Sequence, residues 1–292
     1  MSVFQANAQT VKDRQDFEDA VQITTDFDEN RGELTFSANN RDFCDYYLYV
    51  DMSHMQGFLT MGAGQIVTVH PGQQRLFTLK TNPDARKYSF SYRYTMYRGD
   101  VKAKPNADFI YALPCTSGNT VIAAVEKNQE GYQLSFELSS DTLYACRGGA
   151  VCDDDLKDFT AKGHQNFSDS RWLSQITLYH EDRTFGEYIF FGKPLISAGS
   201  TVKMGSPIAV INSNTTSLVK FSTYFLDKNK VDQKNIGNKH THFRPFFQIA
   251  NEGKIRLETN KSYVCEITDE MLMQDMSKRE KKKFLQKKEV EK

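Results

Sequence analysis

Residues 174–191 read Ser174-Gln-Ile-Thr-Leu-Tyr-His-Glu-Asp-Arg-Thr-Phe-Gly-Glu-Tyr-Ile-Phe-Phe191. Apolar and polar residues alternate on both sides of a charged segment, and a period of two is typical of a strand with one buried face. The stretch therefore predicts two strands joined by a charged turn. Farther on, Val202-Lys-Met-Gly-Ser-Pro-Ile-Ala209 predicts a tight corner that leads into a third strand.

The composition agrees with a mainly β protein. Aromatic residues make up 12% of the 292 residues, with 21 Phe and 14 Tyr, and such residues are enriched in strands. The length indicates one large or two ordinary domains. Runs with strand character are expected at 33–38, 46–50, 58–61, 65–69, 76–79, 88–97, 109–115, 120–125, 132–138, 142–146, 149–152, 174–180, 185–191, 207–211 and 218–226.

We expect four segments along the chain. Residues 1–30 are expected to be a leader, in which Ala6-Asn-Ala8 fits the small-x-small pattern of a signal cleavage site, so that residues 1–8 are read as a trimmed signal region or a plain N-terminus. Residues 31–100 predict an N-terminal β-sandwich, because short strands are separated by Gly, Pro and Asn turns. We expect residues 109–268 to form a second, antiparallel β domain. Residues 269–292 are expected to form a helical, Lys-rich tail, with Thr268 as the N-cap of its first helix.

Charge and cysteine content limit the partners. The net charge is zero, which gives no field that would favour nucleic acid. The tail from 278 to 292 holds seven Lys, one Arg and three Glu, and is expected to extend into solvent or to contact an anionic partner. No stretch reaches the roughly 18 apolar residues of a membrane span. None of the five Cys forms a CxxC pair; free thiols are expected, with Cys146 and Cys152 as the one pairing left open.

The second domain resembles the lysostaphin-type zinc endopeptidases, a family that cleaves peptidoglycan and has a duplicated, antiparallel β fold. Phe109-Ile-Tyr-Ala-Leu-Pro114 is similar to the family's opening strand, and Thr142-Leu-Tyr-Ala-Cys-Arg-Gly-Gly-Ala-Val151 to its "PVYAAxxGxV" bend. Residues 176–188 are similar to its "I-I-H-x-D-G-T-x-x-x-Y" hairpin, and residues 202–209 to "V-K-x-G-x-x-I-G". The four motifs occur in the family's order over about half of the chain.

The catalytic residues of that family are missing from the matching positions. The family holds zinc with two His and one Asp and uses two further His. The "H-x-x-x-D" segment corresponds to Glu130-Gly-Tyr-Gln-Leu-Ser-Phe136, where Leu134 or Ser135 stands in place of the Asp. Phe190 takes the place of the His in "Y-x-H-L", and Lys220 and Ser222 the places of the two His in "H-L-H-F".

The residues that remain from the hairpin motif are His180 and Tyr188, which match scaffold positions rather than ligands. An ammonium at position 220 would repel a zinc ion. The resemblance therefore implies a pseudoenzyme without a cofactor, exported to the periplasm or otherwise associated with the bacterial cell envelope. Its former active-site groove, expected to be lined by Ser135, Phe190, Lys220 and Ser222, would bind a protein or a peptide with a carboxylate, or peptidoglycan.

Two alternatives remain open at this point. His240-Thr-His242-Phe243 has the "H-x-H-F" spelling, and two His on one strand would point the same way about 7 Å apart. A divergent zinc endopeptidase would use His240 and His242, with His164 or His180 as a further ligand. The third reading is a structural subunit of an envelope or secretion assembly.

Overall fold

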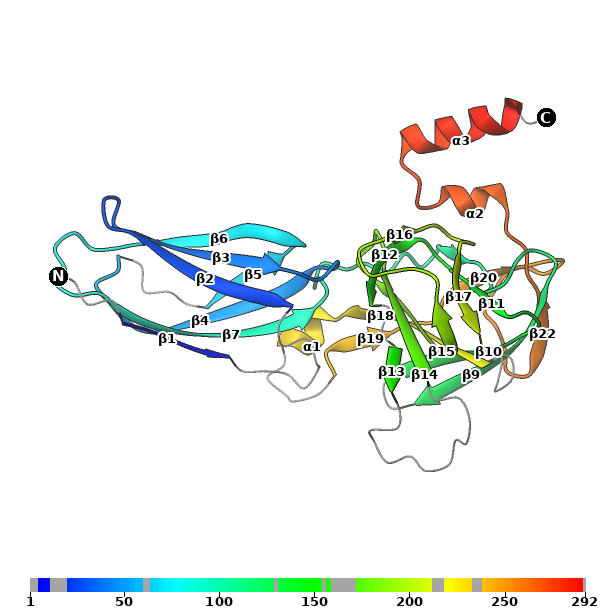
Figure 1. Cartoon of the computed structure of the whole chain (residues 1–292), viewed down its shortest axis with the longest axis horizontal. Coiled ribbons are helices and arrows are strands. Elements are labelled where there is room, and N and C mark those ends of the chain that lie inside the picture. The colour runs from blue at the N-terminus through cyan, green and yellow to red at the C-terminus, as the bar shows by residue number, and fades with distance from the viewer. Residues whose placement is uncertain are drawn as a thin grey trace. The chain divides into compact units, whose positions relative to one another are not determined.

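The computed structural model describes residues 5–10, 20–59, 64–128, 131–153, 156–158, 172–211, 218–232 and 238–290. The chain divides into two compact units (Figure 1). Unit 1 contains Met1–Lys102 and Val231–Gln233, and unit 2 contains Ala103–Lys230 and Lys234–Lys292. The mainly β class that the sequence predicts is confirmed, with antiparallel pairing throughout the described strands except for the parallel pairs β1–β7 and β8–β20, and with two of the described helices at the C-terminal end.

Unit 1 contains a four-stranded sheet in the order β1-β7-β4-β5 and a three-stranded sheet in the order β2-β3-β6. Aromatic contacts join the two sheets: the ring of Phe36 on β3 lies 5.2 Å from that of Tyr92 and 6.0 Å from that of Phe90 on β7. Alternate residues of β3 are buried, as expected for a strand with one core face. The strands are β1 (Gln5–Thr10), β2 (Val21–Asp28), β3 (Glu33–Asn40), β4 (Tyr46–Gln56), β5 (Gln65–Val69), β6 (Gly72–Lys80) and β7 (Ser89–Arg98).

The expected leader, residues 1–30, is wrong for the part that the structure describes. Strand β2 pairs with β3 along its full length, from Val21 opposite Asn40 to Asp28 opposite Glu33, and β1 pairs with β7 in parallel. The physical reason is visible in β2 itself, where Val21, Ile23 and Phe27 alternate with polar residues. Both segments therefore belong to the sheets of unit 1, and residues 11–19 lie outside the described part.

Unit 2 is built on a 12-stranded sheet with the main order β16-β12-β14-β15-β18-β10-β9-β22. Strands β11, β13, β17 and β19 extend it, and β21-β20-β8 form a separate three-stranded sheet. The strands are β8 (Ile110–Tyr111), β9 (Thr120–Asn128), β10 (Gly131–Leu138), β11 (Thr142–Tyr144), β12 (Gly149–Asp153), β13 (Leu156–Asp158), β14 (Trp172–Tyr179), β15 (Phe185–Pro194), β16 (Thr201–Val202), β17 (Pro207–Ile211), β18 (Leu218–Leu226), β19 (His240–His242), β20 (Phe246–Ile249), β21 (Gly253–Ile255) and β22 (Lys261–Val264).

Strand β15 forms the centre of this sheet because it pairs with three neighbours. Its first part pairs with β14 and β18, and its last part turns to pair with β17, with Gly192 opposite Ile211. A Cβ atom at Gly192 would lie 2.1 Å from the carbonyl oxygen of Val210, so only glycine lets β17 approach this closely. The hairpin predicted from residues 174–191 is thus the β14–β15 hairpin, and the predicted third strand is β17.

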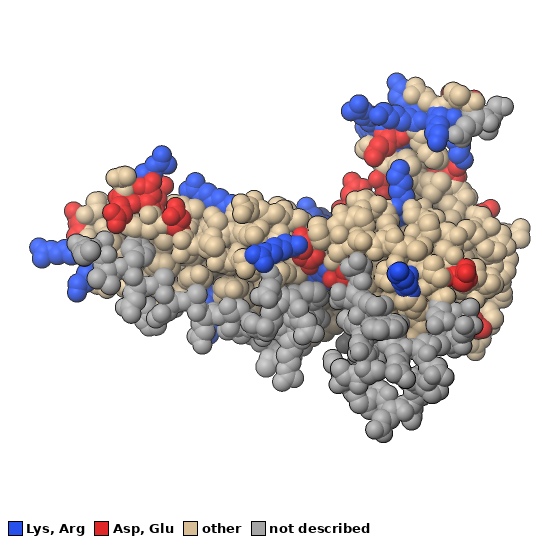
Figure 2. All heavy atoms as spheres, in the orientation of Figure 1, with Lys and Arg blue, Asp and Glu red and all other residues tan. Residues whose placement is uncertain are grey.

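Among the described residues, three helices follow or interrupt the strands: α1 (Lys228–Asp232), α2 (Asp269–Met273) and α3 (Lys278–Val290). Thr268 caps α2 as predicted, since its hydroxyl accepts the backbone N–H of Met271. Lys and Arg side chains gather on α3, at the top of the view in Figure 2. Within the described ranges, no helix has the length and apolar character needed to cross a membrane. All five cysteines are buried and carry free thiols, so Cys146 and Cys152 are not joined.

Candidate functional site

Three of the four residues predicted to line a groove lie on one face of the sheet. Lys220 on β18 stands directly opposite Ser135 on β10 and, on its other side, opposite Ile189 on β15. Ser222 stands opposite Glu187. Directly paired residues share a face of the sheet. Ser135, Lys220 and Ser222 therefore occupy the face that is turned away from the hydrophobic core of unit 2.

Phe190, the fourth predicted residue, lies on the other face, which corrects the predicted groove. It pairs with Ser174 on β14 and Val219 on β18, and it is 1% exposed within the core. Because side chains alternate along a strand, the neighbours Ile189 and Phe190 must point to opposite faces. The apolar residue beside Lys220 is therefore Ile189, and Phe190 cannot line a surface with it.

We use the name polar outer face for the set of side chains around Lys220. Its hydrogen bonds run between side chains on neighbouring strands: the Ser135 hydroxyl donates to Glu126 Oε1 at 2.9 Å, and Gln175 Nε2 donates to Glu187 Oε2 at 3.0 Å. Ser135 and Ser222 are buried among the longer side chains, whereas Lys220 is half-exposed and has no hydrogen-bond or ion-pair partner among the described residues. The face consists of Glu126, Gln133, Ser135, Gln175, Glu187, Ile189, Lys220 and Ser222.

Sequence reasoning missed most of this face. Gln175 and Glu187 belong to the hairpin of residues 174–191, Gln133 lies within the segment that corresponds to "H-x-x-x-D", and Glu126 precedes that segment. The usable signal was the alternation itself, which places Gln175, Glu187 and Ile189 on the polar side of their strands. Which strand lies beside Lys220 depends on the pairing of β18 with β15, and the chain order alone does not give it.

The core face of the same strands, on which Phe190 lies, is aromatic. Around Phe221 on β18, the rings of Tyr188, Tyr111 and Phe136 lie with centroids 4.8, 6.3 and 6.4 Å from its own. The direct neighbours of Phe190 and Phe221 across the strands carry no imidazole, thiol or carboxylate. They are Ser174 and Val219 beside Phe190, and Leu134 and Tyr188 beside Phe221. Zinc is bound by such donors, so none of these four cross-strand neighbours is a zinc ligand.

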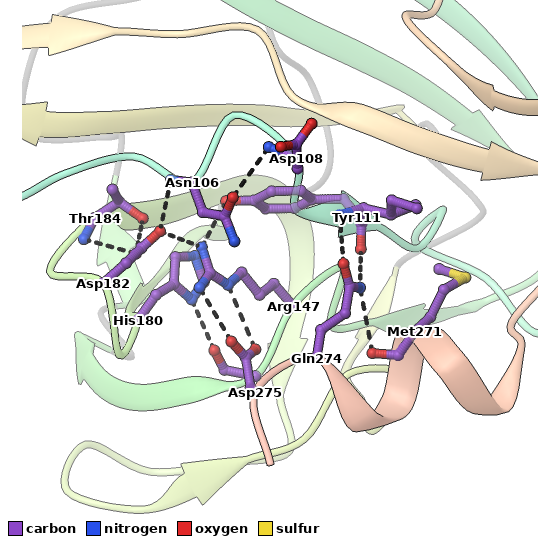
Figure 3. A network of polar contacts seen from close by, with 12 residues as sticks. Asn106, Asp108, Tyr111, Arg147, His180, Asp182, Thr184, Met271, Gln274 and Asp275 are labelled. Carbon is purple, nitrogen blue, oxygen red and sulfur yellow. Dashed lines mark hydrogen bonds and ion pairs between the residues drawn. The ribbon is translucent and has the colours of Figure 1, made fainter. Parts of the chain in front are cut away.

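The hairpin residue His180 lies in a buried polar network rather than at a surface (Figure 3). Its Nδ1 atom is 2.7 Å from the carbonyl oxygen of Gly148. Because a carbonyl only accepts, Nδ1 carries the proton and donates it. The Nε2 atom has no hydrogen-bond partner in the described part of the chain and faces Gly186, where a Cβ atom would approach to 2.8 Å. This imidazole therefore has no route for delivering a proton to a substrate.

Burial lowers the pKa of His180 to about 3, and the nearby charge of Arg147 acts in the same direction. The ring is consequently neutral at physiological pH. A neutral, enclosed imidazole with one fixed hydrogen bond has a structural role.

Arg147 is the centre of the network, and it was not singled out from the sequence. Its guanidinium donates to Asp182 at 2.9 Å and to Asp275 at 3.1 Å, and it stacks 3.7 Å above the ring of Phe109. Its side chain is only 3% exposed. Asp182 lies in the turn of the β14–β15 hairpin and Asp275 follows α2, so one buried cation joins the hairpin to the C-terminal helices (Figure 3).

Tyr188 and Gln274 provide further links of the same kind. The Tyr188 hydroxyl accepts the backbone N–H of Cys146 at 2.8 Å, which fixes the bend before β12 to β15. Gln274 accepts the N–H of Ile110 and donates to its carbonyl, both at 2.9 Å, and so holds α2 against β8. These contacts link the bend, the central strand and α2 within unit 2.

His240 and His242 lie on β19, opposite Leu226 and Tyr224 of β18. Their rings pack beside the ring of Tyr224, with centroids 5.2 Å and 5.4 Å away. In the described ranges, neither histidine belongs to a group of three ligand-bearing side chains close enough to hold a metal ion. His164 lies outside the described residues, and His180 is fixed in the network above.

No protein-family model matches the chain, and no curated protein matches it in a sequence search. Among solved structures, the chain is similar to the crystal structure of Helicobacter pylori Csd3. The sequence identity is 9%, the match covers 92% of this chain and 82% of that chain, and the TM-score is 0.30. At that TM-score, neither fold nor function is transferred to this chain.

Proposed function

We propose that this protein is a non-catalytic homologue of lysostaphin-type zinc endopeptidases that acts as a binding or accessory protein of the bacterial cell envelope. The family assignment in this proposal is supported by the four sequence motifs in order. The loss of catalysis is supported by one structural observation above all: Phe190, which stands in place of a catalytic His in the motif, is buried in the core among apolar and aromatic side chains.

A zinc endopeptidase holds a metal-activated water beside groups that transfer protons. Ser174 and Val219, the residues paired directly with Phe190, offer no imidazole, thiol or carboxylate as a metal ligand. His180, the nearest imidazole in the hairpin, is neutral and enclosed.

The polar outer face is the surface that we assign to binding. Lys220 offers a half-exposed ammonium between the strands β10 and β15, and Ile189 lies directly beside it. A cation next to an aliphatic side chain suits a peptide segment that carries a carboxylate close to an apolar group. The proposed ligand is therefore a peptide or a protein segment with a free carboxylate, as in the stem peptides of a cell wall or in an envelope protein.

The proposal is tested with synthetic peptides that end in a free carboxylate, with the same peptides as C-terminal amides for comparison. Amidation, or Lys220→Gln in the protein, should weaken binding about two- to fivefold, because a partly exposed ion pair is worth about 0.5–1 kcal/mol. Lys220→Glu should weaken it further, and Lys220→Arg should retain it. Lys203→Glu, an exposed charge reversal after β16, is the matched control. Equal binding of acid and amide peptides, or equal effects of the two Lys→Glu variants, would contradict the assignment.

A further inference from the structure

The C-terminal helix α3 is the most strongly charged element of the chain. It contains seven of the 37 basic residues and two of the 37 acidic residues, a net charge of +5. The rest of the chain therefore holds 30 basic and 35 acidic residues, a net charge of −5. Because none of its residues is buried, this helix is not held in position by packing against a hydrophobic core.

The helix is nevertheless well formed and attached on one side. Ser277 and Glu280 form a capping box, in which the backbone N–H of Ser277 donates to Glu280 Oε2 at 2.9 Å and the N–H of Glu280 donates to the Ser277 hydroxyl at 3.4 Å. Lys288 forms an ion pair with Asp269 of α2 and lies 5.5 Å from the ring centroid of Phe284. Residues 281, 284 and 288 are half-exposed and share one face, because they are three or four positions apart. This face is the one turned toward α2.

The opposite face is cationic. Arg279, Lys282, Lys283 and Lys287 are exposed and recur at spacings of three and four residues, so they form a row along the helix. Figure 2 shows that Lys and Arg side chains gather on α3. No ion pair within the described part of the chain joins Arg279, Lys282 or Lys283 to an acidic side chain. A helix of 13 residues is about 20 Å long, so the row presents a flat, extended cationic surface.

We propose that this face of α3 binds the surface of an anionic lipid bilayer. Charge complementarity carries the proposal, since Lys or Arg near an anionic bilayer strengthens binding about fivefold per residue. The exposed apolar residues favour lipid over other polyanions: Val290 is 88% exposed on the cationic face, and Leu285 is 48% exposed between that face and the one turned toward α2. Headgroups accommodate such side chains, whereas single-stranded nucleic acid would be bound by exposed aromatic rings, which the cationic face does not carry.

The composition of α3 also indicates how it would contact a bilayer. The apolar residues of α3 are few and do not form one continuous side, so the helix would rest on the headgroups without deep insertion. Binding should therefore depend on salt, because the Debye length falls from about 10 Å at 0.1 M to about 3 Å at 1 M ionic strength. This proposal does not depend on the function proposed above, which concerns a different face of unit 2.

The test is co-sedimentation of the full chain with vesicles of phosphatidylcholine, alone or mixed with phosphatidylglycerol. We expect binding only to the mixed vesicles, and its loss at about 1 M salt. The double variant Lys282→Glu/Lys283→Glu should weaken it by at least about 25-fold, because two contributions of about fivefold are lost. Lys282→Arg/Lys283→Arg should bind like the natural chain, since the charge is kept.

The control is Lys102→Glu/Lys104→Glu, which reverses the same number of exposed charges outside α3 and should leave vesicle binding unchanged. The proposal is overturned if vesicle binding does not depend on phosphatidylglycerol, or if the α3 and control variants lose binding equally. It is also overturned if the chain binds an oligonucleotide through α3 but does not bind vesicles. Circular dichroism of the α3 variant confirms that the fold is intact, so that a loss of binding reports on the surface.

Discussion

Replacing Arg147 by Met tests whether the buried network holds unit 2 together. The methionine keeps much of the side-chain volume, so the change removes the charge and its hydrogen bonds rather than opening a large cavity. Asp182, whose side chain is 16% exposed, would lose its cation and keep only Thr184 and the backbone N–H of Asn106 as donors. The cation stacked on Phe109 would be lost as well.

The two carboxylates are expected to respond differently, and their pKa values show why. Burial tends to raise the pKa of Asp182, but the charge and hydrogen bonds of Arg147 and the Thr184 hydroxyl outweigh it, and the pKa is lowered. At Asp275 burial wins over Arg147, and the pKa is raised. Asp182 therefore interacts more strongly with Arg147 than Asp275 does, and the side chain of Asp275 is 28% exposed.

The expected losses follow from this difference. Removing one partner of a buried ion pair typically costs about 3–5 kcal/mol, which we expect for Arg147→Met. Asp275→Asn should cost about 1 kcal/mol, as expected for a more exposed pair. In differential scanning calorimetry the first change should lower the Tm of unit 2 by about 10 °C, at about 2–4 °C per kcal/mol for a domain of this size. A shift below about 3 °C for Arg147→Met, or equal shifts for both variants, would refute the central role of Arg147.

Two further substitutions test the inner side of unit 2. The folded-state pKa of His180, about 3, lies below its unfolded value, so the unfolded chain takes up a proton as the pH falls and the folded chain does not. The free energy of unfolding of the natural protein should therefore fall by about 2 kcal/mol between about pH 7.5 and 5. His180→Gln should remove this part of the pH dependence. Urea unfolding at both pH values measures this, and parallel losses in the two proteins would show that His180 does not titrate as described. Phe190→Ala should cost about 3–5 kcal/mol if the ring is in the core, whereas Ile189→Ala on the half-exposed outer face should cost clearly less. If urea unfolding shows similarly small losses of unfolding free energy for both variants, Phe190 is not in the core.

The strands were largely predictable because alternation is a local property. The run expected at 218–226 coincides with β18, and the run at 185–191 lies within β15. Strand β2 was missed although Val21, Ile23 and Phe27 alternate, because the polar residues before it favoured a leader. A short amphipathic run becomes a strand only when a partner such as β3 is available.

The faces and the network were not predictable in the same way. A shift of one residue in register moves a side chain to the opposite face, and this is the error that placed Phe190 beside Lys220. Arg147 and Asp275 are 128 positions apart, and nothing local to either residue indicates the other. The only sequence signal for a buried Arg147 is its position between Cys146 and Gly148, in the bend motif that precedes β12.

The central claim, that the resemblance to a zinc endopeptidase is one of scaffold without catalysis, is tested most directly by elemental analysis of the purified protein combined with a peptidoglycan digestion assay. We predict zinc well below one ion per chain and no release of soluble fragments, with or without added zinc. One tightly bound zinc per chain that is lost in His240→Ala, together with fragments released by the natural protein only, would contradict the account.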